Sequence, residues 1–277
     1  MITLTLNRQF TVPLELEKLL PDVTHKLEHA GVCATPVFMG RRQYRLDEFF
    51  EIEGELSDHI EIHGTTSKMK SIGRGMSRGK IVLHGDAGMH LGALMTGGEI
   101  NVTGSAADWA GAEMRGGMIR IAGDAGGQVG AAYRGDAAGM RGGTIVIAGT
   151  AGQEVGMRMK RGTIVVQGKV GDFAGLQMKG GTIVLLRGAG ARPGSWMIRG
   201  TILSLAELPL LPTFRYASSG TPTFLRLYAK QLETLGAPIP LDESQGNWDR
   251  YSGDLSVPGK GEVLVWRAGT SCETGSD

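Results

Sequence analysis

The chain is poor in the residues that mark several large classes of protein. It has two cysteines, Cys33 and Cys272, far apart in sequence. Neither a disulfide framework nor a metal cluster is therefore expected, and both thiols should be free in a reducing compartment. The net charge is +1 and no long basic run occurs, which argues against nucleic-acid binding. No apolar run approaches the roughly 20 residues that cross a bilayer, and the N-terminus lacks a signal-peptide pattern. We therefore expect a cytoplasmic protein without a membrane partner.

Aromatic residues make up only 6% of the chain, whereas glycine occurs 45 times. Many of the glycines belong to a repeat with a period of 19 residues. One glycine per copy serves as an anchor: Gly79, Gly98, Gly117, Gly143, Gly162, Gly181 and Gly200. A single interval of 26 residues indicates a seven-residue insertion around Ala131 to Ala137. Isoleucine stands two residues after every anchor, and methionine stands three residues before it.

This unit is too short and too glycine-rich for a helical repeat, but it fits one coil of a β-helix. The residues two and four after the anchor are almost always apolar, so they should face the interior, with glycines at the corners. The methionine column should fill a corner; its regularity would also suit a thioether metal site. We predict an all-β protein, a single-stranded parallel β-helix of about seven 19-residue coils.

Small terminal segments should flank the repeat. Residues 1–56 are predicted to form an N-terminal cap with a short helix near Leu14 to Ala30. Residues 57–205 form the predicted repeat domain, which begins with an imperfect coil at His59 to Gly64. Residues 206–277 should contain an α-helix from about Thr223 to Leu235 and a final strand, Gly261 to Trp266.

Candidate catalytic and metal-binding residues are few. Two histidine pairs, His59 with His63 and His84 with His90, have no cysteine or carboxylate partner at a recognisable ligand spacing. This favours surface or corner positions over a metal site. The glycine-aspartate order differs from that of calcium-binding repeats, and no complete nucleotide-binding loop occurs. The sequence predicts no catalytic residue and no metal ligand in this chain.

A basic column is more informative. Two residues before the anchor, four consecutive coils carry Arg115, Arg141, Lys160 and Lys179. Like charges one coil apart repel by up to about 1 kcal/mol per pair in water. Long side chains that splay into solvent would make this cost small. The alternative is an anion track for an acidic partner surface or a polyanionic cofactor tail.

An apolar column runs three residues after the anchor in the later coils: Val146, Val165, Val184 and Leu203. These positions should face outward, and an apolar ladder on the outside has to be covered. The cover could be either the predicted C-terminal helix or another subunit. The helix is favoured because it is close in sequence and carries a matching apolar stripe. Truncation after Leu205 should then cause aggregation.

The repeated unit Gly-x-x-Met-(Lys/Arg)-x-Gly-x-Ile-x-(Ile/Val)-x-Gly resembles a β-helix domain found in two families. These are the C-terminal region of glutamate synthase large subunits and the C subunit of formylmethanofuran dehydrogenases. A glutamate synthase also needs a glutaminase domain and a flavin barrel, for which 277 residues leave no room. The ending Arg250-Tyr251-Ser252-Gly253-Asp254-Leu255, followed by Gly259-Lys260-Gly261-Glu262, is similar to the tail of the formylmethanofuran dehydrogenase family. The resemblance covers nearly the whole chain.

The resemblance implies a subunit of a complex that handles formyl groups on an aminomethylfuran carrier. In methanogens such a complex reduces carbon dioxide with tungsten or molybdenum and iron–sulfur clusters. In methylotrophic bacteria a formyltransferase/hydrolase complex moves the formyl group from tetrahydromethanopterin to methylofuran and releases formate. Arginine outnumbers lysine 19 to 10, a composition that favours the bacterial branch.

The chain itself would be a noncatalytic scaffold, an obligate subunit of the enzyme complex. It would bind no cofactor alone; methylofuran or methanofuran and tetrahydromethanopterin would serve the complex, and any metal would lie in a sister subunit. Its implied partners are an amidohydrolase-like hydrolase, a formyltransferase and a molybdo- or tungsto-enzyme-like subunit. The glutamate-rich tail of methylofuran would suit the track from Arg115 to Lys179. Two rival classes are a β-helix acyltransferase, whose hexapeptide period does not fit 19 residues, and a stand-alone binding module.

Overall fold

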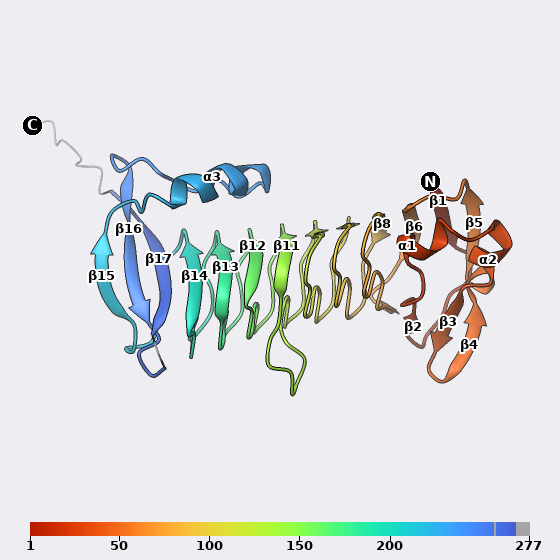
Figure 1. The fold of residues 1–277 in the computed structure, drawn as a ribbon, viewed down its shortest axis with the longest axis horizontal. Helices are drawn as coiled ribbons and strands as arrows, with labels where there is room; N and C mark the ends of the chain where they lie inside the picture. The colour runs from red at the N-terminus through yellow and green to blue at the C-terminus, as the bar shows by residue number, and fades with distance from the viewer. Residues whose placement is uncertain (258, 270–277) are drawn as a thin grey trace, which may run out of the picture.

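The computed structural model describes residues 1–257 and 259–269. The chain forms an elongated rod with the N-terminal segment at one end and the C-terminal segment at the other (Figure 1). Cys33 is a free thiol at the end of helix α2 (His29–Cys33). Cys272, the other cysteine expected to be free, lies outside the described residues.

Within the described residues, one sheet of 13 strands runs along the rod in the order β15-β16-β17-β14-β13-β12-β11-β10-β9-β8-β6-β1-β5. In the part of this order that runs from β17 through β14 to β1, every strand is parallel to its neighbours. At the ends, β5 is antiparallel to β1, β16 to β17 and β15 to β16. Each repeat copy supplies one strand: β8 (Lys80–Gly85), β9 (Glu99–Val102), β10 (Met118–Ile121), β11 (Arg141–Ile147), β12 (Arg161–Val166), β13 (Lys179–Leu185) and β14 (Arg199–Ser204).

The strand register follows the sequence repeat. Ile81 pairs with Ile100, and Ile119 pairs with Ile145 although the insertion separates them. The insertion leaves the stack as the long loop before β11 (Figure 1). A second line of contacts joins the coils through isolated parallel bridges at Ala87, Ala106, Ala125, Ala151, Val170 and Ala189. The predicted all-β class, dominated by parallel strands, is confirmed.

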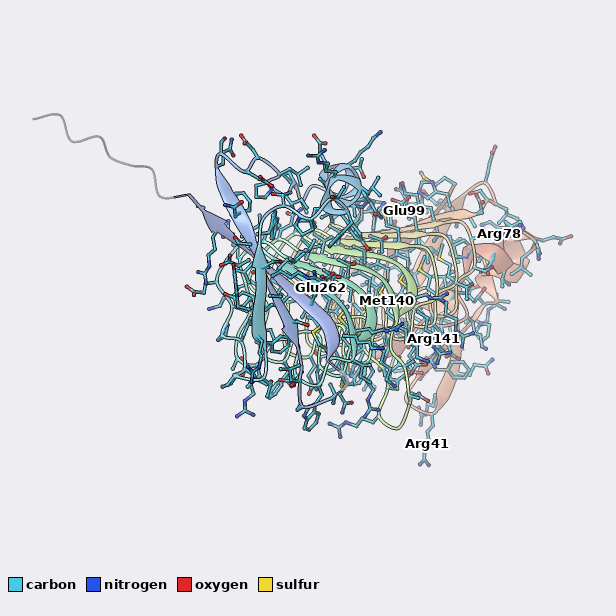
Figure 2. All side chains as sticks on the ribbon, turned by 60° about the vertical axis from the view of Figure 1, so that its left-hand side comes forward. Arg41, Arg78, Glu99, Met140, Arg141 and Glu262 are labelled. Carbon is cyan, nitrogen blue, oxygen red and sulfur yellow. The ribbon has the colours of Figure 1, made fainter. Side chains whose placement is uncertain are left out.

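Isoleucines and methionines fill the interior of the coils. The isoleucine two residues after each anchor and the methionine three residues before it are fully buried in all seven copies. Six of the seven methionines pack against the anchor glycine of the next coil, and Met197 packs against Gly261. A Cβ on Gly117, for example, would lie 2.7 Å from the Met95 Cε and 2.7 Å from the Gly98 carbonyl oxygen. The methionines therefore fill a corner, as predicted, and Figure 2 shows their sulfur atoms within the coils.

The N-terminal segment caps the first coil. Strands β1 (Ile2–Leu6), β5 (Phe50–Gly54) and β6 (His59–Thr65) extend the long sheet. A second sheet has the order β4-β3-β2-β7, with β4 (Arg42–Arg45), β3 (Pro36–Met39), β2 (Leu14–Glu15) and β7 (Met69–Lys70). A short 3-10 helix covers Leu46–Glu48.

The predicted helix near Leu14 to Ala30 is wrong. Leu14 pairs with Met69 in a strand, and the rest of the segment forms two short helices, α1 (Pro21–Thr24) and α2. Pro21 lies in the first turn of α1, where a backbone N–H would have no partner within the helix, so proline is tolerated there. In the interior of a helix that began near Leu14, the same proline would remove a hydrogen bond and break the helix.

The C-terminal segment closes the other end. β17 (Lys260–Ala268) adds to β14 in parallel, and β16 (Gly246–Gly253) and β15 (Arg215–Ser219) follow. Helix α3 (Leu225–Thr234) lies over the sheet (Figure 1). The predicted C-terminal helix and final strand are both present.

Candidate functional site

Basic side chains gather where strands β12, β13 and β14 begin. Four of them line a groove of about 550 Å³ together with backbone and hydroxyl groups; the lining residues are Lys160, Arg161, Lys179, Arg199, Gly180, Gly181, Gly200, Thr182, Thr201 and Tyr228. None of these residues is acidic. The groove is therefore a positively charged hollow in the side of the rod.

The repeat itself explains this geometry. In each coil a buried methionine fills the corner, and around the groove the two residues between this methionine and the anchor glycine are half-buried or exposed. The anchor positions carry no side chain, so the floor of the groove is backbone at Gly181 and Gly200. A β-bulge places Lys179 opposite Arg199 and Arg141 opposite Arg161, so charges from two sequence columns face each other across neighbouring coils.

The groove keeps its positive charge because its cations are not neutralised. Among the described residues, no carboxylate oxygen lies within 4.0 Å of its lysine or arginine nitrogens. The nearby Glu262 accepts a hydrogen bond from Thr201 Oγ1 at 2.8 Å and pairs with Arg250 Nε at 3.0 Å. The Thr182 hydroxyl donates to Tyr228 Oη of α3 at 3.0 Å. Such a hollow concentrates anions, and the arginines can bind carboxylates in a bidentate manner.

Only half of the predicted basic column lines this groove. Lys160 and Lys179 do; Arg141, exposed at the start of β11, and Arg115, before β10, do not. Figure 2 labels Arg141 beside the buried Met140. Arg161 and Arg199, which stand one residue before the anchor, were not among the predicted site residues. The column of residues one before the anchor contains both arginines. The β-bulge that brings this column next to the lysine column has no recognisable pattern in the sequence.

Lys179 also connects the groove to the insertion. Its Nζ donates to the Ala137 carbonyl oxygen at 2.6 Å, and Arg158 Nη1 donates to the Asp136 carbonyl oxygen at 2.7 Å. A second pocket of about 360 Å³ lies on this side, lined by Ala137, Arg158, Gln177, Lys179, Trp196, Ile198 and Val257. The insertion thus contributes backbone to the surface next to the groove.

Trp196, a residue that is 54% exposed, lines this pocket. Its backbone N–H donates to Asp254 Oδ2 at 2.9 Å, while Asp254 Oδ1 accepts from the N–H and the hydroxyl of Ser256 at 2.9 and 2.8 Å. Asp254 is almost fully buried. Burial by itself would raise the pKa of the Asp254 carboxyl, but the hydrogen bonds from Ser256 and Trp196 outweigh it and hold the pKa below its usual value.

Asp254→Asn is expected to destabilise the fold by about 1–3 kcal/mol, because a buried carboxylate that accepts several hydrogen bonds is replaced by an amide that can accept fewer. Since the folded pKa of Asp254 is lowered, its stabilisation is present above the unfolded value of about 3.9 and is lost as the pH falls through the folded value. Urea unfolding at pH 7 and at pH 3 should therefore differ less for Asp254→Asn than for the unchanged protein.

Asp242→Asn is a matched control for Asp254→Asn. Asp242 Oδ1 accepts from the N–H and hydroxyl of Ser244, two residues on, but the residue is exposed. This variant should leave the unfolding midpoint nearly unchanged. Equal midpoints for the two variants would contradict the role given to Asp254.

The predicted apolar column lies under helix α3. Val146, Val165, Val184 and Leu203 belong to one buried cluster together with Leu225 and Leu232 of α3, Leu235, Trp248 and Leu264. The chain thus supplies apolar side chains of its own that pack against this face of the sheet.

The histidines pair differently from the sequence-based pairs. His63 stacks on His84 with ring centroids 4.1 Å apart, and Glu61 lies within 4.0 Å of His59, His63 and His84. His90 instead meets Tyr133, with 2.9 Å between its Nδ1 and the hydroxyl oxygen. Among the described residues, no helix is both long and apolar enough to cross a membrane.

Comparison with known proteins gives a consistent result. The model of the GXGXG motif family matches residues 59–208, more than half of the chain. The chain is 43% identical over 85 residues to the C subunit of a molybdenum-containing formylmethanofuran dehydrogenase from Methanothermobacter thermautotrophicus. It is 34% identical over 92 residues to the C subunit of a tungsten-containing formylmethanofuran dehydrogenase from Methanococcus maripaludis. These alignments cover 30% and 32% of the chain, and 21% and 34% of the two relatives.

A solved structure matches over almost the full length. It is a chain of the formyltransferase/hydrolase complex from Methylorubrum extorquens, crystallised with methylofuran. The two chains are 37% identical with a TM-score of 0.88, and the match covers 95% of this chain and 98% of that one. The chain therefore belongs to the GXGXG motif family, and within it to the group formed by the C subunit of formylmethanofuran dehydrogenases and its counterpart in the formyltransferase/hydrolase complex.

Proposed function

We propose that this chain is a noncatalytic scaffold subunit of a formyltransferase/hydrolase complex, and that its basic groove holds the acidic tail of the furan carrier. The observation that carries the proposal is the groove at Lys160, Arg161, Lys179 and Arg199, whose cations have no ion-pair partner among the described residues. The related complex was crystallised with methylofuran, which supports a ligand of this chemistry. A chain of glutamates offers one carboxylate per residue to such a row of cations.

In this proposal the rod positions the carrier and the sister subunits and does not itself catalyse a reaction. Formyl transfer from tetrahydromethanopterin to the carrier and hydrolysis to formate would occur in a formyltransferase and an amidohydrolase-like sister subunit, and a molybdo- or tungsto-enzyme-like subunit would hold any metal. Anchoring only the tail leaves the formyl-bearing head free to move between two active sites, and tethering raises its local concentration at each. The near-complete structural match favours this complex over a formylmethanofuran dehydrogenase, since the matching subunits of those enzymes align with only about a third of the chain.

Reversing two charges tests the groove. Lys160→Glu combined with Lys179→Glu should weaken binding of an oligoglutamate peptide to the assembled complex by roughly 10–100-fold at low salt, because each reversal turns an attraction into a repulsion worth on the order of 1 kcal/mol. Isothermal titration at several salt concentrations measures this. The difference should shrink as salt increases.

Arg41→Glu combined with Arg42→Glu is the control for net charge, since these exposed residues lie in the N-terminal cap. This variant should bind the peptide as the unchanged complex does. Equal affinity for all three proteins across the salt series would refute the tail site. Failure of the chain to co-purify with a hydrolase and a formyltransferase after co-expression would refute the scaffold role.

A further inference from the structure

The outer face of the rod carries a cluster of metal-ligand side chains at the end far from the basic groove. His59, Glu61 and His63 occupy alternate positions of β6, so all three side chains leave the same face of the strand. His84 of β8 pairs with His63 across the parallel ladder. The parallel pairing of β6 with β8 therefore brings His84, one coil further along the chain, next to Glu61 and His63.

The distances in this cluster suit a common ion. Glu61 Oε2 lies 3.4 Å from His84 Nε2 and 3.7 Å from His63 Nε2, and one donor atom from each of the three residues lies within 4.8 Å of the others. In a tetrahedral zinc site with bonds of about 2.0–2.1 Å, neighbouring donor atoms are about 3.3–3.4 Å apart. A small contraction around an ion would reach that geometry.

One of these donor atoms is poorly satisfied without an ion. His84 Nε2 is buried and has no hydrogen-bond partner among the described residues. A buried ring nitrogen without a hydrogen bond has lost its contact with water, and no protein group compensates for the free energy of this desolvation. A metal bound to His84 Nε2 and Glu61 would satisfy both groups at once.

The two histidine rings lie against each other. His63 and His84 stack with ring centroids 4.1 Å and planes 5° apart, so their ring nitrogens do not converge on one point in this arrangement. Their side chains are 41% and 38% exposed, so each ring can tilt until its Nε2 points at a shared ion. Lys80, the nearest lysine in the ladder, pairs with His59 at the other end of β6 rather than with His63.

We propose that Glu61, His63 and His84 form a binding site for a divalent transition metal of the zinc class. Two imidazoles and one carboxylate are a donor set that such ions accept, and three protein ligands leave one position for water. The ion would join β6 to β8, fastening the imperfect first coil to the regular repeat. This site is independent of the basic groove and of the formyl chemistry.

Metal titration of the tag-free, full-length chain tests the proposal. Because His29 Nδ1 lies 3.5 Å from Cys33 Sγ and the two could also bind zinc, all proteins should lack both cysteines. Competition with a chromophoric chelator should show one equivalent of bound Zn²⁺ in this background. His63→Ala, His84→Ala and Glu61→Gln should each weaken binding by more than about 100-fold, since even second-shell substitutions cost 10–100-fold.

His29→Ala serves as the matched histidine control and should bind one equivalent with unchanged affinity. Circular dichroism without metal should be the same for all variants, and His63→Gln provides a second test if an alanine variant fails to fold. Zn²⁺ should raise the thermal unfolding midpoint of the background protein and of His29→Ala only. Absence of a bound equivalent in the background, or the same affinity in the three ligand variants, would overturn the proposal.

Discussion

Replacing Gly117 by alanine is expected to destabilise the rod by about 2–5 kcal/mol. The residue has a φ of +87°, and a Cβ there would lie 2.7 Å from the Gly98 carbonyl oxygen of the preceding coil. Left-handed strain accounts for about 1–2 kcal/mol, and forcing two coils apart adds about 1–3 kcal/mol. Because the contact involves backbone, no side-chain rotation can relieve it.

Gly75→Ala isolates the contact between coils from the strain. Gly75 also has a positive φ, +74°, but a Cβ there would meet nothing within 4 Å. The equivalent position in other coils already carries Leu94, Glu113, Arg158, Gln177 or Trp196 at positive φ. Urea unfolding followed by circular dichroism should show a loss of about 1–2 kcal/mol for Gly75→Ala. If Gly117→Ala lowered the free energy of unfolding by no more than Gly75→Ala does, the close contact between coils would not be the reason for the anchor glycine.

Leu232→Ala is expected to cost about 2–5 kcal/mol, the second large effect. Leu232 of α3 is fully buried in the cluster that contains Val165 and Val184. Removing its side chain leaves a cavity between helix and sheet, and it weakens the cover over an apolar ladder that would otherwise attract other chains. Chemical unfolding measures the stability loss, and light scattering during mild heating measures the aggregation.

Leu227→Ala provides the comparison on the same helix. Leu227 is 79% exposed, so its truncation should change the free energy of unfolding by less than about 0.5 kcal/mol and leave aggregation unaltered. If both variants lost stability equally, the effect would come from the helix itself rather than from its packing on the valines.

The architecture could be predicted from sequence because one short pattern recurs. A column such as Ile81, Ile100 and Ile119 has a single environment that repeats in every coil, so each copy supports the assignment of the others. The cap offered no such repetition. There, Leu14 joins a strand through its partner Met69, and pairing at this distance leaves no trace in the local apolar pattern.

The candidate sites were predictable only in part for a related reason. Lys160 and Lys179 could be predicted because they share one position of the repeat. Arg199 escaped because a bulge shifts it into register with Lys179. Likewise, Glu61 meets His84 across the ladder from an irregular first coil, where no anchor glycine marks the alignment.

The antiparallel strands at the two ends of the sheet set a limit that the repeat alone would not. A stack of parallel coils can in principle grow without end by adding further copies of the chain, as fibres do. At one end β5 runs antiparallel to β1, and at the other end β16 runs antiparallel to β17 with β15 antiparallel to β16, so at each end a strand that belongs to no coil follows the last parallel one. Within the described residues the parallel part has ten strands, a length of about 43 Å. Proteins docked at its two ends would be held at a separation that is counted in whole coils.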